Sequence, residues 1–195
     1  MRLFDRSLRH RRAVWVCLWV TCLTLLAGVV QAREAISIRA PFVTSAAGVY
    51  VLNAQLQFTT PAEVEQAVRE GATLSLELQI RVSRERSWWR DEVLAQLQQR
   101  YMLLYHGVSE RYLVRNANSG AQTSYATFAQ AIESLQHVEN LPILDQALIV
   151  ADARNEVSLR AIAEVRSIPR VLGLLLFWVD SFVLESDWYT WPLKP

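Results

Sequence analysis

Cysteine is scarce in this sequence and confined to one end of it. The chain has 195 residues and two cysteines, Cys17 and Cys22, both within residues 1–32. Residues 33–195 therefore contain no thiol that could form a disulfide, ligate a metal or act as a nucleophile. Disulfide-stabilised folds and cysteine-dependent sites are excluded for this part of the chain.

An excess of charge of either sign is also lacking. The chain has 20 basic and 19 acidic residues, of which five arginines and one aspartate fall in residues 1–32. The remaining fifteen basic and eighteen acidic residues make residues 33–195 mildly acidic. We therefore do not expect binding to nucleic acid by bulk charge. A hydrophobic content of 52% with 20% charged residues is typical of a folded protein rather than a disordered one.

One long hydrophobic run lies near the N-terminus. Residues 13–30 carry no charge, follow a cluster of arginines and precede Ala32, after which a signal peptidase could cut. This pattern predicts a signal peptide over residues 1–32. Because the run also reaches the length of a membrane-spanning helix, an uncleaved anchor in the inner membrane is the alternative. In both cases residues 33–195 are expected in the periplasm, as a single exported β-rich domain.

Alternation of apolar and polar residues with a period of two dominates residues 33–195. Residues 49–58 and 73–82 follow it without interruption and predict two half-buried strands. Further strands are expected at residues 97–105, 111–115, 121–125, 157–168 and 182–191. This pattern favours antiparallel sheets with one wet face. We expect a mainly β protein with short helices (α+β), built as an antiparallel β-sandwich or open barrel.

Two short helices are expected between the strands. The first should begin with Thr60 as its N-cap and end at Gly71. The second should begin at Thr127, whose side chain and that of Gln130 can form a capping box. Residues 171–179 are apolar throughout but too short to cross a bilayer, so a buried helix or a hydrophobic lip is expected there.

Several short motifs run in order along the same region. They are Ser87-Trp88-Trp89-Arg90-Asp91-Glu92, Leu104-Tyr105-His106, Tyr112-Leu113-Val114-Arg115-Asn116 and Ser186-Asp187-Trp188-Tyr189-Thr190-Trp191-Pro192-Leu193. Together they resemble an exported proteobacterial family catalogued as a domain of unknown function. The resemblance implies a role in the cell envelope. It also implies that the gene lies beside one for a membrane sensor kinase of the nitrogen-regulation type. The family has no established activity, so no catalytic residue is carried over.

Patterns for metal binding or histidine catalysis are weak. Residues 33–195 contain two histidines, His106 and His137, and they are not spaced as a pair on one helix face. His106 stands beside a turn, and His137 ends a helical stripe where a cation suits the helix C-terminus. Both are expected to be ordinary surface or capping residues. We expect no metal site and no cofactor.

Paired carboxylates for acid–base catalysis are equally weak. Asp91 and Glu92 are adjacent, so on a strand their side chains point to opposite faces. We expect them to begin a turn or to pair with Arg90 or Arg100. No serine has the surroundings of an activated nucleophile. The sequence therefore predicts a protein that is not an enzyme.

Tryptophan beside arginine is the most unusual feature of residues 33–195. The candidate binding residues are Trp88, Trp89, Arg86, Arg90, Trp188 and Trp191. In one explanation, one ring of each group packs in the core while another stacks on arginine. In the other, they form an exposed surface for a protein partner, a glycan or the membrane interface. If Trp88 and Trp89 lie on an extended segment, only one of them can enter the core.

The function expected from these features is a non-enzymatic binding or accessory module for an envelope protein partner, with a membrane sensor as one such partner. A glycan- or lipid-binding module that uses exposed tryptophan and arginine is the alternative. A cryptic hydrolase is the remote alternative and would need a cleft with a perturbed carboxylate beside His106. Contact with the membrane is expected only through residues 13–30, if they are not removed.

Overall fold

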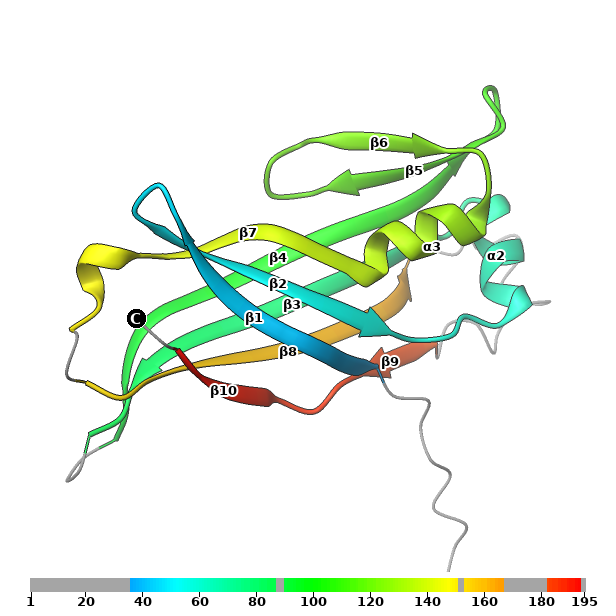
Figure 1. The fold of residues 1–195 in the computed structure, drawn as a ribbon. Helices are drawn as coiled ribbons and strands as arrows, with labels where there is room; N and C mark the ends of the chain where they lie inside the picture. Colours follow the sequence, from blue (N-terminus) through cyan, green and yellow to red (C-terminus); the bar gives the residue numbers. More distant parts are fainter. Residues whose placement is uncertain (1–35, 87–89, 151–152, 167–181, 194–195) are drawn as a thin grey trace, which may run out of the picture. The chain divides into compact units, whose positions relative to one another are not determined.

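The computed structural model describes residues 36–86, 90–150, 153–166 and 182–193 (Figure 1). The chain divides into two units, Met1–Arg33 and Glu34–Pro195, and every described residue belongs to the second. The expected signal peptide or anchor, the pair Trp88–Trp89 and the apolar residues 171–179 lie outside the described residues.

Ten strands and two α-helices are described. They are β1 (Ser37–Ala46), β2 (Val49–Gln57), α2 (Ala62–Arg69), β3 (Thr73–Arg84), β4 (Glu92–His106), β5 (Arg111–Asn116), β6 (Gln122–Tyr125), α3 (Phe128–Gln136), β7 (His137–Asp145), β8 (Asn155–Arg166), β9 (Val183–Glu185) and β10 (Tyr189–Leu193), with a short 3-10 helix, η1 (Gln146–Leu148), after β7.

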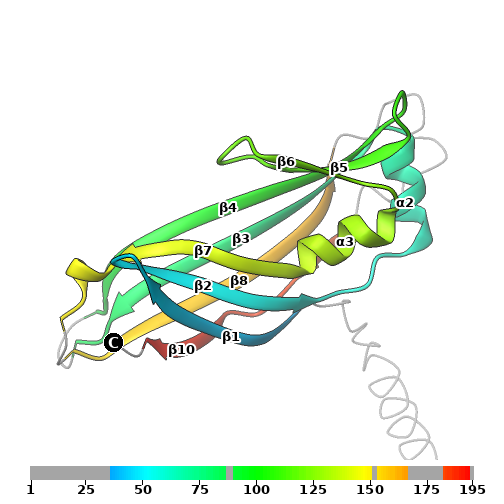
Figure 2. The same ribbon diagram turned by 45° about the horizontal axis from the view of Figure 1, so that its top comes forward.

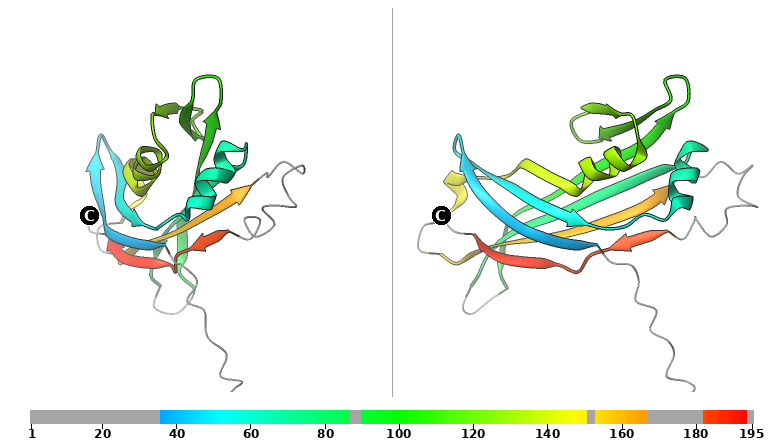
Figure 3. Two further views of the ribbon diagram at one scale, coloured as in Figure 1. Left: turned by 90° about the vertical axis from the view of Figure 1, so that its right-hand side faces the viewer. Right: turned by 45° about the vertical axis from the view of Figure 1, so that its right-hand side comes forward.

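The strands form two antiparallel sheets. One has the order β1-β2-β7, and the other has the order β10-β8-β3-β4-β5-β6 with β9 paired to β8. The two sheets enclose a common hydrophobic core (Figure 3). Helices α2 and α3 lie at one end of this unit, opposite the β1–β2 turn and η1 (Figures 1 and 2). The expected mainly β fold with short helices, a sandwich or open barrel, is confirmed.

Regular alternation placed the core strands correctly. On β2, Leu52, Ala54 and Leu56 are buried, while the polar residues Asn53 and Gln55 between them are partly or fully exposed. On β3, alternate residues from Leu74 to Val82 enter the core and the others face away from it. A sheet with one buried face requires this pattern, because successive side chains of a strand point to opposite faces.

The helix boundaries were predicted with one error. Thr127 caps α3 as expected, because its side chain accepts a hydrogen bond from the backbone N–H of Gln130 at 3.3 Å. Thr60, however, does not cap α2. The N-cap is Pro61, whose extended backbone (φ −59°, ψ 153°) delays the first helical residue to Ala62. Gly71 ends that segment at φ 105°, as expected of a glycine that follows a helix.

Bulges explain the strands that the sequence did not reveal. In β1 the register shifts around Ala40, which has φ 41°. In β7 the register shifts beside Asn140, which has φ 50° and whose N–H donates to Asn53 Oδ1 at 3.0 Å. A bulge adds a residue and breaks the period of two, so neither strand shows continuous alternation.

The last expected strand, residues 182–191, is two strands in the structure. Ser186 lies between β9 and β10 and is buried. Its backbone N–H donates to the carbonyl of Ala161 at 2.9 Å, and its Oγ accepts from the N–H of Ala161 at 2.9 Å. Ser186 thus hydrogen-bonds both the N–H and the C=O of Ala161, and one of these bonds uses its side chain. Regular strand pairing is interrupted here and resumes at Tyr189.

Candidate functional site

An open cavity lies between the β5–β6 hairpin and the junction of α3 with β7. It has a volume of about 680 Å³, and a second cavity of about 240 Å³ shares part of its wall. Both are lined by Tyr101, Tyr125, Ser134 and His137, and the larger one also by Arg111, Glu133 and Glu139. We call the two cavities together the α3 groove. In Figures 1 and 2 the β5–β6 hairpin stands apart from β7.

Helix α3 builds one wall of the groove because of its apolar stripe. Phe128, Ala131, Ile132 and Leu135 recur at helical spacing and are all buried. Packing this stripe on the core fixes the rotation of the helix about its axis. Glu133, an exposed residue of α3, then lines the larger cavity.

His137 has a defined tautomer at the C-terminal end of α3. Its Nδ1 lies 2.8 Å from the backbone carbonyl oxygen of Glu133. A carbonyl oxygen only accepts hydrogen bonds, so Nδ1 carries the proton and Nε2 is an acceptor when the ring is neutral. The prediction that His137 stands at a helix C-terminus is confirmed, and the ring lines the groove.

The opposite wall carries a tyrosine and a tethered arginine. Burial raises the pKa of the Tyr101 hydroxyl, which therefore stays protonated at neutral pH and can donate a hydrogen bond. Arg111 donates from Nε to Ser124 Oγ at 3.1 Å and from Nη2 to the Ser124 carbonyl at 3.2 Å. These bonds tie the guanidinium to β6, while Glu133 and Glu139 supply two carboxylates.

A bulge adjoins the groove on β7. Asn140 holds a left-handed backbone conformation next to Glu139, and the side chain of Asn53 accepts its N–H. Bulges of this kind redirect a side chain and interrupt the pairing of an edge strand. No sequence pattern indicates the groove, because its walls come from β4, β5, β6, α3 and β7, which meet only in the folded chain.

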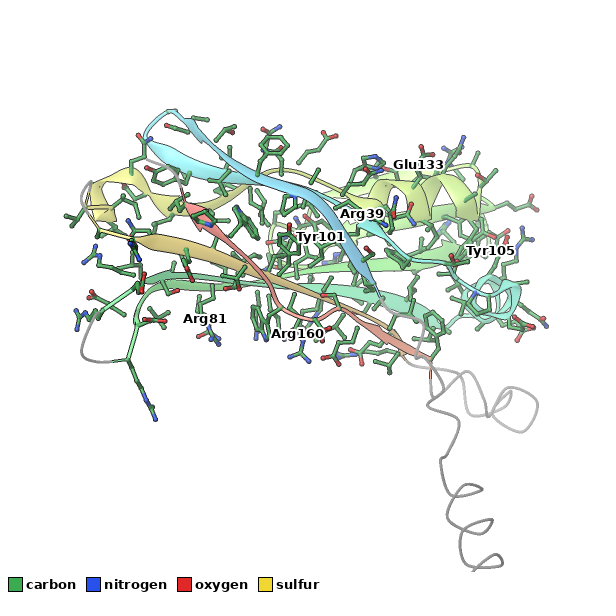
Figure 4. The ribbon with its side chains drawn as sticks, turned by 60° about the horizontal axis from the view of Figure 1, so that its bottom comes forward. Arg39, Arg81, Tyr101, Tyr105, Glu133 and Arg160 are labelled. Carbon is green, nitrogen blue, oxygen red and sulfur yellow. The ribbon has the colours of Figure 1, made fainter. Side chains whose placement is uncertain are left out.

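Trp188 stacks with two arginines on the outer face of the seven-stranded sheet. The guanidinium carbon of Arg81 lies 5.2 Å from the centre of the Trp188 ring, and that of Arg160 lies 5.9 Å from it. Figure 4 shows Arg81 and Arg160 projecting from one face of β3 and β8. Arg160 also forms an ion pair with Glu185. Trp188 keeps 40% of its surface exposed.

Trp191 lies differently. It is half-buried and packs against the hydrophobic core, with its ring centre 5.9 Å from that of Tyr189. The explanation of one core aromatic and one arginine-stacked aromatic therefore describes Trp191 and Trp188. The arginines involved were missed, because Arg81 and Arg160 come near Trp188 only through strand pairing.

Arg86 is engaged in an ion pair. Its Nη2 lies 2.7 Å from Glu92 Oε2, and Arg84 Nη1 lies 3.2 Å from the same oxygen. The expected pairing of Glu92 with Arg90 or Arg100 is wrong, and Glu92 begins β4 rather than a turn. Cross-strand register decides the partner, since β3 pairs Arg84 directly with Glu92. Arg90 is exposed, and among the described residues the cations that stack on Trp188 are Arg81 and Arg160, not Arg86 or Arg90.

Arg100 instead pairs with Glu77, which lies beside it on β3. The pKa of Glu77 is lowered, first by the hydrogen bond from the Gln79 amide and then by the one from Arg100. His106 is the exposed last residue of β4, beside the following turn, with Nδ1 2.8 Å from Ser109 Oγ. The cleft with a perturbed carboxylate that a hydrolase would need beside His106 is not found among the described residues.

In the described part of the chain, no group of three or more His, Cys, Asp or Glu residues is placed to hold a metal ion. No described helix is long and apolar enough to cross a membrane.

Comparison with known proteins gives one match. A family model described as a domain of unknown function (DUF4390) matches residues 33–192. The chain belongs to the DUF4390 family. The DUF4390 match contains every described element, from β1 on, except the last residue of β10. It includes the α3 groove and the Trp188 stack, and the predicted membership of a family of unknown function is confirmed. No curated protein and no solved structure matches the chain.

Proposed function

We propose that this DUF4390 chain is an exported, non-enzymatic binding module of the cell envelope, and that its α3 groove receives a segment of a protein partner. The groove carries this proposal. It is open, it combines tyrosines with charged and hydrogen-bonding side chains, and its volume of about 680 Å³ falls in the range of binding pockets. The pattern of residues 1–32 supports export.

The charges of the groove favour a partner segment with basic side chains. Glu133 and Glu139 are both exposed on its wall, whereas Arg111 is already hydrogen-bonded to Ser124. Complementary charge raises the rate of encounter and selects among partners. A membrane sensor is the class of partner that the resemblance implies.

The alternative of a glycan- or lipid-binding module has one observation in its favour. Trp188 is exposed and its ring is flanked by two arginines, an arrangement on which a sugar ring or a headgroup could stack. However, neither Trp188 nor the two arginines line the cavities at α3 or the cavity at the start of α2, so this face offers a sugar or headgroup no pocket among those three. We therefore prefer the protein partner.

Site-specific cross-linking in the native envelope tests the proposal. A photo-reactive residue in place of Gln130, which lines the groove, should give a discrete adduct with one protein. The same residue in place of Gln66, exposed on α2, is the matched control and should not give that adduct. An adduct of equal yield at both positions, or none at Gln130, would contradict the proposal.

Charge reversal provides the second arm of the test. Glu133→Arg should abolish the adduct formed at residue 130, while Glu63→Arg, which changes an exposed glutamate of α2, should leave it intact. Export is tested separately. A periplasmic reporter fused after Pro195 should be active, and the purified protein should begin at Arg33 if the signal is cleaved.

A further inference from the structure

Strand β4 has a long edge without a described partner. It spans 15 residues, and on one side it pairs with β3 along nearly its whole length. On the other side β5 pairs with residues 101–106 alone. Among the described residues, the N-terminal part of β4 is therefore a free sheet edge.

The side chain of Asn118 ends the pairing between β5 and β4. Its Oδ1 accepts from the backbone N–H of Arg100 at 2.9 Å, and its Nδ2 donates to the carbonyl of Gln98 at 2.8 Å. Asn118 lies in the turn after β5. Its side-chain amide therefore bonds two backbone groups of β4 that a longer β5 would otherwise pair with. Beyond this point the β5–β6 hairpin turns back and leaves β4.

The free edge presents backbone groups at Gln96. Arg100 and Gln98 direct backbone groups toward the β5 side, and alternate residues of a strand do the same. The N–H and C=O of Gln96 therefore point outward from the sheet. Gln96 and Gln98 are exposed, as is Val93 at 52%, so the edge is accessible.

This edge differs from the other described edges of the two sheets. β1, β7 and β10 contain Pro41, Pro142 and Pro192, and β6 and β9 are only four and three residues long. Proline and short length are common protections against unwanted pairing. Residues 93–99 of β4 contain no charge, no proline and no glycine. An edge left open in this way is suited to strand addition.

We propose that a second copy of this chain pairs with the edge, β4 against β4 in the antiparallel sense, with the two-fold axis at Gln96. The charges around the edge support this occupant. In the register with β3, Leu94 is the extra residue of a bulge and Arg100 stands four positions after Gln96. Counted without Leu94, Asp91, the residue just before β4, stands four positions before Gln96.

This symmetry makes the edge self-complementary. Pairing about Gln96 places Asp91 of each copy opposite Arg100 of the other, and the residues between Glu92 and Arg100 are uncharged. An isologous two-fold interface requires this kind of match, because each residue meets its counterpart in reverse order. The proposal concerns a different surface from the α3 groove and stands or falls independently of it.

Cysteine cross-linking of the full chain in the envelope tests the register. Cys17 and Cys22 are first replaced by serine, and Gln96→Cys is then introduced. Directly opposed residues of an antiparallel pair have Cα atoms about 5.5 Å apart, which suits a disulfide. We expect a covalent dimer from Gln96→Cys. Gln55→Cys, exposed on the central strand β2, is the control and should stay monomeric.

Opposite charges introduced at residue 96 test whether the partner on this edge is a second copy of the chain rather than another protein. In the full chain purified in mild detergent, the wild type should sediment as a dimer. Gln96→Lys alone and Gln96→Glu alone should be monomeric or weakened, because like charges then face each other. An equimolar mixture of the two should restore the dimer. Gln55→Lys should behave as the wild type.

Three results would overturn the proposal. They are a monomeric wild type, equal cross-linking through residues 96 and 55, and a mixture of the two charged variants that stays monomeric. The last result would mean that the edge does not face its own copy.

Discussion

The hydroxyl of Tyr112 lies 2.7 Å from Nε of Arg69 and so joins β5 to α2. The same hydroxyl donates to Glu65 Oε1 at 2.8 Å. Tyr112 is 1% exposed, and its ring packs edge-on against Phe128 of α3 with ring centres 5.6 Å apart. One side chain therefore connects both helices to the sheet and holds the end of the molecule where the α3 groove lies.

Removal of this hydroxyl should destabilise the fold moderately. Tyr112→Phe leaves Arg69 and Glu65 paired with each other at 3.3 Å but removes two hydrogen bonds from a buried position. We expect the free energy of unfolding to fall by about 1 kcal/mol, measured by urea denaturation. Tyr189→Phe, at an exposed position, is the control and should change it by less than about 0.5 kcal/mol. Equal effects in both variants would contradict the connecting role of Tyr112.

Stability should depend on the ionisation of Glu77. Its pKa in the folded state lies below the ordinary value of 4.5, because Gln79 and Arg100 donate hydrogen bonds to the carboxylate. A group with a lowered folded-state pKa contributes stability that is present above its unfolded pKa and is lost as the pH falls through the folded value.

Glu77→Gln should therefore be less stable than the wild type near neutral pH, by about 1 kcal/mol. The difference should shrink as the pH falls below 4.5. Urea denaturation at a series of pH values measures this. The prediction fails if the difference between the two proteins stays constant across the acid range.

The turn between β1 and β2 can be improved. Ala47 and Gly48 form a two-residue connection with φ of 50° and 81°. A turn with two positive φ values favours Asn-Gly, since alanine is strained in the left-handed region. Ala47→Asn should raise the free energy of unfolding by roughly 0.5–1 kcal/mol, and Gly48→Ala should lower it by about 1 kcal/mol. Thermal melts of the two variants should move in opposite directions.

The sequence predicted those parts of the fold that depend on neighbouring residues. Uninterrupted alternation located the core faces of β2, β3 and β8, and a local capping signal located the start of α3. Strands β1 and β7 were missed, because left-handed residues at Ala40 and Asn140 break their alternation.

The candidate site could be predicted only in part. That Trp188 and Trp191 have different surroundings follows from strand alternation. The identity of the arginines beside Trp188 depends on the register of β3 and β8, which no local pattern encodes. The α3 groove depends in the same way on how a hairpin, a helix and a second sheet meet.

Trp188 and Trp191 should separate stability from binding. Trp191 packs against the core, so Trp191→Ala should lower the free energy of unfolding by roughly 2 kcal/mol, less than for a fully buried tryptophan. Trp188 is exposed and contributes stacking with Arg81 and Arg160, and Arg160 keeps its ion pair with Glu185 when the ring is removed. Trp188→Ala should therefore cost about 1 kcal/mol or less.

Binding should respond in the opposite order if the Trp188 face contacts a glycan or lipid. Trp188→Ala would then lose retention on isolated envelope material while its melting temperature stays near that of the wild type. The Trp191→Ala variant would still be retained on envelope material at temperatures below its lowered melting temperature, because the Trp191 ring lies on the core side of the sheet. If the protein partner in the α3 groove is the main ligand, both variants should keep the adduct at residue 130. Loss of that adduct in Trp188→Ala would show that the partner reaches across the sheet face, and would contradict its restriction to the groove.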